Sequence, residues 1–68
     1  MPIRLKQLLI DIKKIKLELS IIQKNEIVLF GTSKKILRNK KLHNYNGDPV
    51  EHIEKTGEGW KVYIGFDN

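Results

Sequence analysis

Residues 1–22, MPIRLKQLLIDIKKIKLELSII, carry two overlapping patterns that predict different folds. Apolar residues recur in steps of three and four, the spacing of one helix face, at Leu5, Leu8, Ile12, Ile15, Leu19 and Ile22. Residues 15–21 also alternate between apolar and polar side chains, which is typical of a strand, and isoleucine forms helices less readily than leucine. We predict a helix over about residues 3–19. The alternative is a helix that ends near Lys13 and is followed by a strand of residues 15–22.

The rest of the chain carries strand and turn signals. The apolar run EIVLF at residues 26–30 is closed by Gly31 and predicts a buried strand, which pairs with residues 15–22 as a hairpin in the alternative above. Asn46-Gly47 is a preferred pair for a two-residue hairpin turn, because both central residues of that turn need positive φ. Together with the alternating segment after Gly59, this turn predicts a three-stranded meander of residues 40–45, 49–55 and 60–66.

These patterns combine into one α+β domain over residues 1–68, with an N-terminal amphipathic helix packed on an antiparallel three- to four-stranded β-meander. Residues 32–39, TSKKILRN, fit either one helical turn capped by Ser33 or an ordered loop. The expected core joins helix and strand side chains: Leu5, Leu8, Ile12 and Ile15 with Trp60, Val62, Ile64 and Phe66.

Several classes of function lack the residues they need. Cysteine is absent and only His43 and His52 are present, so we expect no disulfide, no structural metal site and no cofactor. No nucleophile motif, phosphate-binding glycine loop or convergent acid and base is apparent, and we therefore expect no catalytic residues. The sequence has no apolar run of membrane-spanning length and no signal-peptide pattern. We expect a cytoplasmic protein that is not an enzyme.

The formal net charge of +5 is concentrated in one segment. Residues 34–47 contain five cations and no carboxylate, whereas residues 48–68 contain two cations and five carboxylates. The basic segment has the composition of a phosphate-contacting surface with an aromatic ring that could stack on a base. Its candidate nucleic-acid-binding residues are Lys34, Lys35, Arg38, Lys40, Lys41, His43 and Tyr45. The alternative is that these lysines reflect a general lysine bias and keep a surface loop or a strand edge solvated.

The sequence thus predicts a small binding module that contacts nucleic acid through residues 34–45 in a regulatory or accessory role. The alternative is a protein–protein interaction module or a small inhibitor protein, of the kind that phages and mobile elements encode. It would place the basic segment against an acidic protein surface. The apolar helix face, where Leu19, Ile21 and Ile22 overrun a small sheet, would favour a homodimer.

Overall fold

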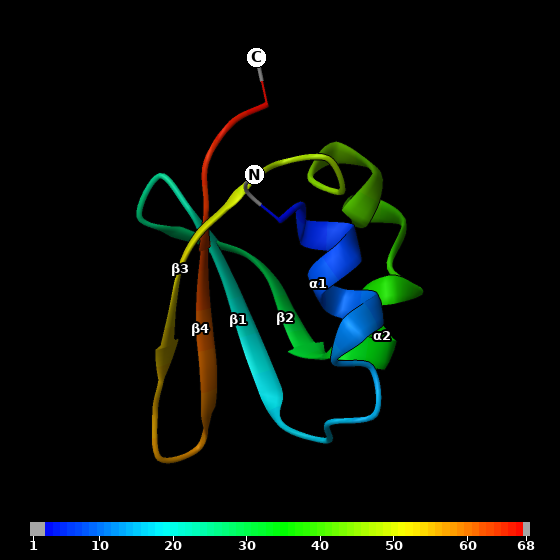
Figure 1. Ribbon diagram of the computed structural model, residues 1–68, viewed down its shortest axis with the longest axis vertical. Coiled ribbons are helices and arrows are strands. Elements are labelled where there is room, and N and C mark those ends of the chain that lie inside the picture. Colours follow the sequence, from blue (N-terminus) through cyan, green and yellow to red (C-terminus); the bar gives the residue numbers. More distant parts are fainter. Residues whose placement is uncertain (1–2, 68) are drawn as a thin grey trace.

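The computed structural model describes residues 3–67, which fold into two layers (Figure 1). One layer contains the helices α1 (Leu5–Asp11) and α2 (Ser33–Leu37) and the 3-10 helix η1 (Lys40–Asn44). The other is a sheet of β1 (Glu18–Gln23), β2 (Glu26–Thr32), β3 (Val50–Lys55) and β4 (Gly59–Ile64). The predicted α+β class, with an N-terminal helix packed on a small sheet, is confirmed.

The sheet consists of two hairpins that meet through a parallel pair of strands. β1 pairs with β2 and β3 pairs with β4, both antiparallel, and the strand order is β2-β1-β4-β3. In the central parallel pair, Leu19 lies opposite Trp60 and Ile21 lies opposite Val62. The chain between β2 and β3 crosses from one edge of the sheet to the other, and α2 and η1 form on this crossing.

The first helix is shorter than predicted, and the alternative for residues 1–22 is the correct one. α1 ends at Asp11, and the segment that was expected to continue it enters β1 instead. Leu19 and Ile21 are both buried on the sheet, so the alternating pattern outweighs the helical spacing to which Leu19 also belongs. The turn of this hairpin is Lys24-Asn25, whose φ values of 54° and 65° suit a two-residue connection. Because both buried side chains belong to a strand, the predicted apolar overhang of the helix is wrong.

The strand predicted at residues 40–45 is also wrong, because this segment forms η1. The Asn39 side chain accepts a hydrogen bond from the Lys41 amide at 2.9 Å and caps the 3-10 turn, while Leu42 is buried beneath it. Asn46-Gly47 therefore connects η1 with β3 and is not a hairpin turn. The helical alternative for residues 32–39 is correct, but its cap is Thr32.

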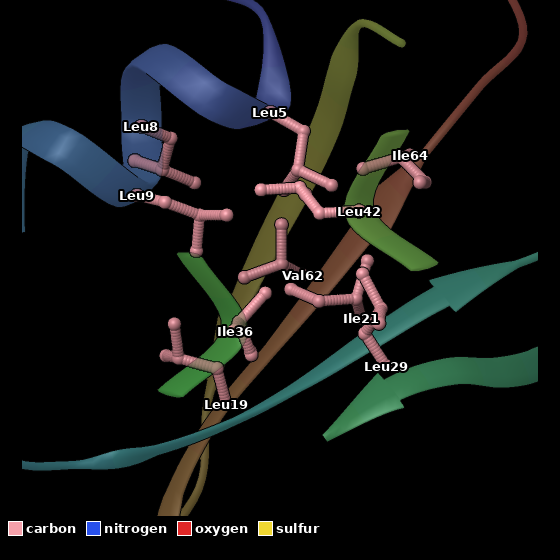
Figure 2. Close-up of a cluster of buried hydrophobic side chains, with 10 residues drawn as sticks. All are labelled: Leu5, Leu8, Leu9, Leu19, Ile21, Leu29, Ile36, Leu42, Val62 and Ile64. Atoms are coloured by element: carbon pink, nitrogen blue, oxygen red, sulfur yellow. The ribbon is translucent and has the colours of Figure 1, made fainter. Parts of the chain in front are cut away.

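Ten buried side chains from both layers form the core (Figure 2). They come from α1, β1, β2, α2, η1 and β4: Leu5, Leu8, Leu9, Leu19, Ile21, Leu29, Ile36, Leu42, Val62 and Ile64. Ile12 and Trp60 of the predicted core are partly buried against this cluster. Phe66 was expected in the core but is 56% exposed, because it lies beyond the last residue of β4.

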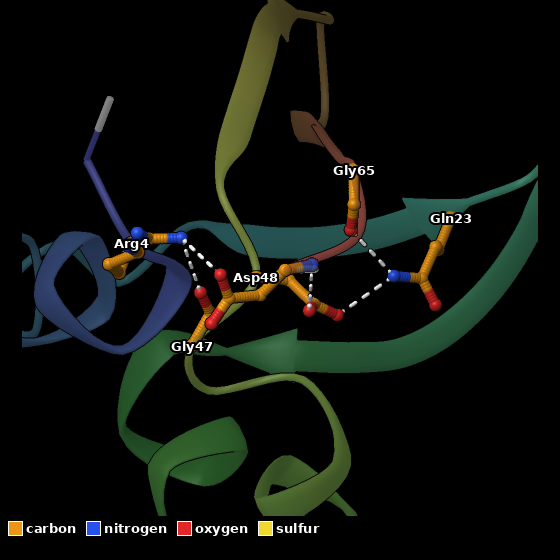
Figure 3. Close-up of polar contacts among 6 residues, drawn as sticks. Arg4, Gln23, Gly47, Asp48 and Gly65 are labelled. Carbon is orange, nitrogen blue, oxygen red and sulfur yellow. Dashed lines mark hydrogen bonds and ion pairs between the residues drawn. The ribbon is translucent and has the colours of Figure 1, made fainter. Parts of the chain in front are cut away.

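A polar network closes the end of the core where the chain enters β3 (Figure 3). The buried Asp48 carboxylate accepts hydrogen bonds from the Gln23 side-chain amide at 2.8 Å and from the Asp67 backbone amide at 3.1 Å. The same Gln23 amide also donates to the Gly65 carbonyl at 2.7 Å. Nearer the solvent, Arg4 pairs with the Asp67 carboxylate at 3.1 Å. The network joins β1, the start of β3 and the segment after β4.

Replacing Asp48 with alanine is expected to lower the free energy of unfolding by about 1–3 kcal/mol, because the buried Gln23 side-chain amide and the partly buried Asp67 backbone amide lose their acceptor. Arg4→Ala serves as the comparison, since the Arg4 and Asp67 side chains are 49% and 51% exposed. Its expected loss is at most about 1 kcal/mol. Urea unfolding followed by circular dichroism measures both, and equal losses would contradict the ranking.

Candidate functional site

An open groove of about 580 Å³ lies between the chain that follows α1 and the helix α2. We call it the basic groove, and it is lined by Lys13, Lys14, Ile15, Lys16, Thr32, Lys34, Leu37 and Arg38. Five of these side chains are cationic and none is acidic. The groove therefore combines one sign of charge from two segments that are about twenty residues apart in the sequence.

The first wall of the groove forms because α1 stops after two turns. Ile12 caps the helix, with its amide bonded to the Leu8 carbonyl at 3.0 Å, and the Lys13 amide bonds to the Ile10 carbonyl at 3.4 Å. The Ile15 amide then bonds to the Ile12 carbonyl at 2.9 Å, which makes a further tight turn. These turns carry the exposed lysines at positions 13, 14 and 16.

The second wall is α2, which is fixed to α1 by one buried hydrogen bond. The Ser33 hydroxyl donates to the Leu9 carbonyl, and Ser33 is only 1% exposed. In an uninterrupted helix the Lys13 amide would bond to that carbonyl, but here it turns to Ile10. Ser33 thus supplies a donor that the end of α1 lacks, and Ile36 anchors the same helix in the core.

The Ser33→Ala variant is expected to lower the free energy of unfolding by about 1–3 kcal/mol, because the buried Leu9 carbonyl loses its partner. For a domain of this size that corresponds to a fall in Tm of roughly 4–8 °C for each kcal/mol. The Thr32→Ala variant is the comparison, since the Thr32 hydroxyl caps α2 at its partly exposed N-terminus. Thermal unfolding measures both, and an unchanged Tm for Ser33→Ala would show that this bond does not hold α2 to α1.

The cations of the groove are available to an anionic ligand. All five side chains are exposed, and within residues 3–67 none of them forms an ion pair. The exposed carboxylates Glu51 and Glu54 lie on β3, the sheet edge opposite β2. The basic groove, which includes Thr32 at the end of β2, and these two carboxylates thus lie at different edges of the sheet.

Neither a family model, a curated protein nor a solved structure matches this chain. Among residues 3–67, no three His, Asp or Glu side chains lie close enough together to hold a metal ion. None of the helices in that range has the length and apolar character to cross a membrane.

The structure separates the candidate residues that the sequence suggested. Lys34 and Arg38 line the basic groove, whereas Lys35 lies on α2 outside it. Lys40, Lys41 and His43 are exposed on η1, where His43 borders a smaller recess with Lys6 and Leu42. Tyr45 is partly buried and packs against the core.

Sequence reasoning missed three cations of the groove, Lys13, Lys14 and Lys16. In a helix that continued to residue 19, they would form ion pairs with Asp11 and Glu18. Because α1 ends at Asp11, that spacing no longer brings the charges together, and the Asp11 carboxylate accepts a hydrogen bond from Gln7 at 2.9 Å. The sequence does contain a signal for these cations, the run KKIK at residues 13–16. It points to a basic surface only when the end of α1 is known.

Proposed function

We propose that the chain is a non-enzymatic nucleic-acid-binding module that holds a phosphodiester backbone in the basic groove, in a regulatory or accessory role. The observation that carries this proposal is the groove itself, which brings together five cations from two segments, none of them in an ion pair with another of residues 3–67, and has no carboxylate in its lining. Cationic side chains that contact successive phosphates supply most of the affinity of sequence-independent binding, because counterions are released. A groove lined by several cations is better suited to a chain of phosphates than to one isolated phosphate group.

The groove favours contacts with the backbone over contacts with the bases. Its lining contains no aromatic ring on which a base could stack and no Asn or Gln that could read a base edge. Arg38 is the only lining side chain with the fork geometry that pairs with guanine. We therefore expect affinity that depends weakly on the sequence of the nucleic acid.

Fluorescence anisotropy with a mixed-sequence duplex at low salt tests the proposal. If all five cations contact phosphates, the logarithm of the binding constant falls with the logarithm of the salt concentration with a slope of roughly −4 to −5. Binding to both DNA and RNA duplexes is expected. The absence of binding at tens of micromolar protein, on the order of ordinary non-specific affinities, would overturn the proposal.

An acidic protein surface is the alternative occupant of the groove. The observation that favours it is the presence of Ile15 and Leu37 between the cations, since apolar centres with charged rims are common in protein interfaces. Purification without nuclease distinguishes the two candidates. Nucleic acid that copurifies and is released by salt supports the backbone proposal, whereas a stoichiometric acidic protein supports the alternative.

A further inference from the structure

The face of the sheet that points away from the helices carries a patch of apolar side chains. Strand register places Ile22 next to Ile27 on one side and next to Tyr63 on the other. In the adjacent row, Ser20 lies between Phe30 and Lys61, and Lys61 lies opposite Glu54. We call this surface the open face, because α1, α2 and η1 all pack on the other side of the sheet (Figure 1).

The open face carries exposed apolar side chains. Ile27 and Phe30 are 63% and 60% exposed, and Ile22 and Tyr63 beside them are half-buried. On an antiparallel sheet with one solvated face, these positions are ordinarily polar. Grouped apolar side chains on such a face mark an interaction surface more often than isolated ones do.

We propose that a second copy of this chain packs on the open face, so that two sheets stack in a symmetric dimer. A symmetric interface must be complementary to itself, and the open face carries both signs of charge in Lys61 and Glu54 beside its apolar row. The basic groove lies on the helical layer and stays outside this contact. Because the groove cations lie outside the contact, the net charge of +5 on each copy opposes association only through long-range repulsion, which salt screens.

The charges around the open face argue against a nucleic acid as its occupant. Phe30 and Lys61 border a recess of about 190 Å³ that is also lined by Glu18 and Glu58. Two carboxylates beside one lysine repel a phosphate backbone, even though Phe30 and Tyr63 offer rings for stacking. The same mixture of charges is compatible with a second copy.

The size of the open face sets the strength expected of the dimer. Four strands of about six residues cover roughly 400 Å², about half of the ~800 Å² that each partner buries in a stable interface. An interface of this size is typical of weak, transient complexes, so we expect a reversible dimer that forms only at high protein concentration.

Sedimentation equilibrium over about 5–500 µM protein tests the dimer. The wild-type chain is expected to shift from its monomer mass of 8.0 kDa towards twice that value, and to shift further at high salt because charge repulsion is screened. Binding of nucleic acid has the opposite dependence on salt, which separates this inference from the proposed function. The double variant Ile27→Thr/Phe30→Thr keeps residues suited to strands and is expected to remain monomeric.

Phe66→Thr is the matched control, because Phe66 is a similarly exposed aromatic residue outside the strands. It is expected to dimerise as the wild type does. A wild-type chain that stays monomeric over the whole range would overturn the inference, as would a double variant that dimerises normally while keeping its circular dichroism spectrum. If the wild type is monomeric and the double variant loses affinity for single-stranded DNA, the open face binds nucleic acid and not a second copy.

Discussion

Replacing Lys13 and Lys14 together with glutamine is expected to lower the affinity for a mixed-sequence duplex about 10- to 100-fold at low salt. Both side chains line the basic groove from the turn after α1. Each lost phosphate contact also removes about 0.9 from the slope of the log–log salt plot, so the double variant should show a slope smaller by about 2. Fluorescence anisotropy over a range of salt concentrations measures both quantities.

Lys40→Gln/Lys41→Gln is the matched control, because it removes the same charge from another exposed Lys-Lys pair. These two lysines lie on η1, outside the basic groove. The control is expected to change affinity only a few-fold through long-range electrostatics, with little change in slope. Equal losses in the two double variants would mean that net charge, and not the groove, determines binding. A larger loss of affinity in the control would show that nucleic acid contacts η1, which belongs to the basic segment predicted from composition.

Gly59→Ala is expected to destabilise the fold by about 3 kcal/mol or more, because the added methyl group has no space. Gly59 begins β4 and lies opposite Glu18 in the parallel pair. A Cβ atom at this position would overlap the backbone carbonyl oxygen of Glu18. Neither backbone can yield without separating β1 from β4, and these two strands join the hairpins of the sheet. A chain of 68 residues has a total stability of only roughly 3–10 kcal/mol, so partial unfolding is expected at room temperature.

Two other glycines provide controls for this prediction. A Cβ atom at Gly57 would meet nothing within 4 Å, and one at Gly65 would meet mainly the side-chain end of Glu51 at 2.7 Å. Glu51 is exposed and free to move. Gly57→Ala is expected to be neutral or slightly stabilising, by up to about 1 kcal/mol, because alanine restricts the unfolded chain. Urea unfolding measures the stability of Gly59→Ala and Gly57→Ala, and equal stability of the two variants would contradict this prediction.

The sequence predicted the kinds of elements in this fold better than their boundaries. The strand of residues 26–30 and the last strand are where their apolar patterns placed them. The end of α1 was missed because residues 15–22 satisfy both helical and strand spacings, and pairing with β4 decides between them. The parallel pairing itself is a contact between distant segments, which local periodicity does not encode. Leu42 alone anchors η1, and one buried residue leaves no periodic signal.

Prediction of the candidate site from the sequence also depended on where α1 ends. Composition identified Lys34 and Arg38, which do line the basic groove, but it grouped them with Lys40 and Lys41 because they are close in sequence. The partners that the structure brings to them are the lysines after α1. Their placement follows from the buried bond between Ser33 and Leu9, two residues whose contact no local pattern predicts.

Chemical-shift mapping of the ¹⁵N-labelled protein with a short mixed-sequence duplex locates the surface that contacts nucleic acid residue by residue. The basic groove predicts that the largest salt-sensitive shifts fall at residues 13–16 and 32–38, from both walls at once. Shifts confined to η1, or centred on Phe30 and Tyr63 of the open face, would contradict it. So would a spectrum that the duplex leaves unchanged at low salt.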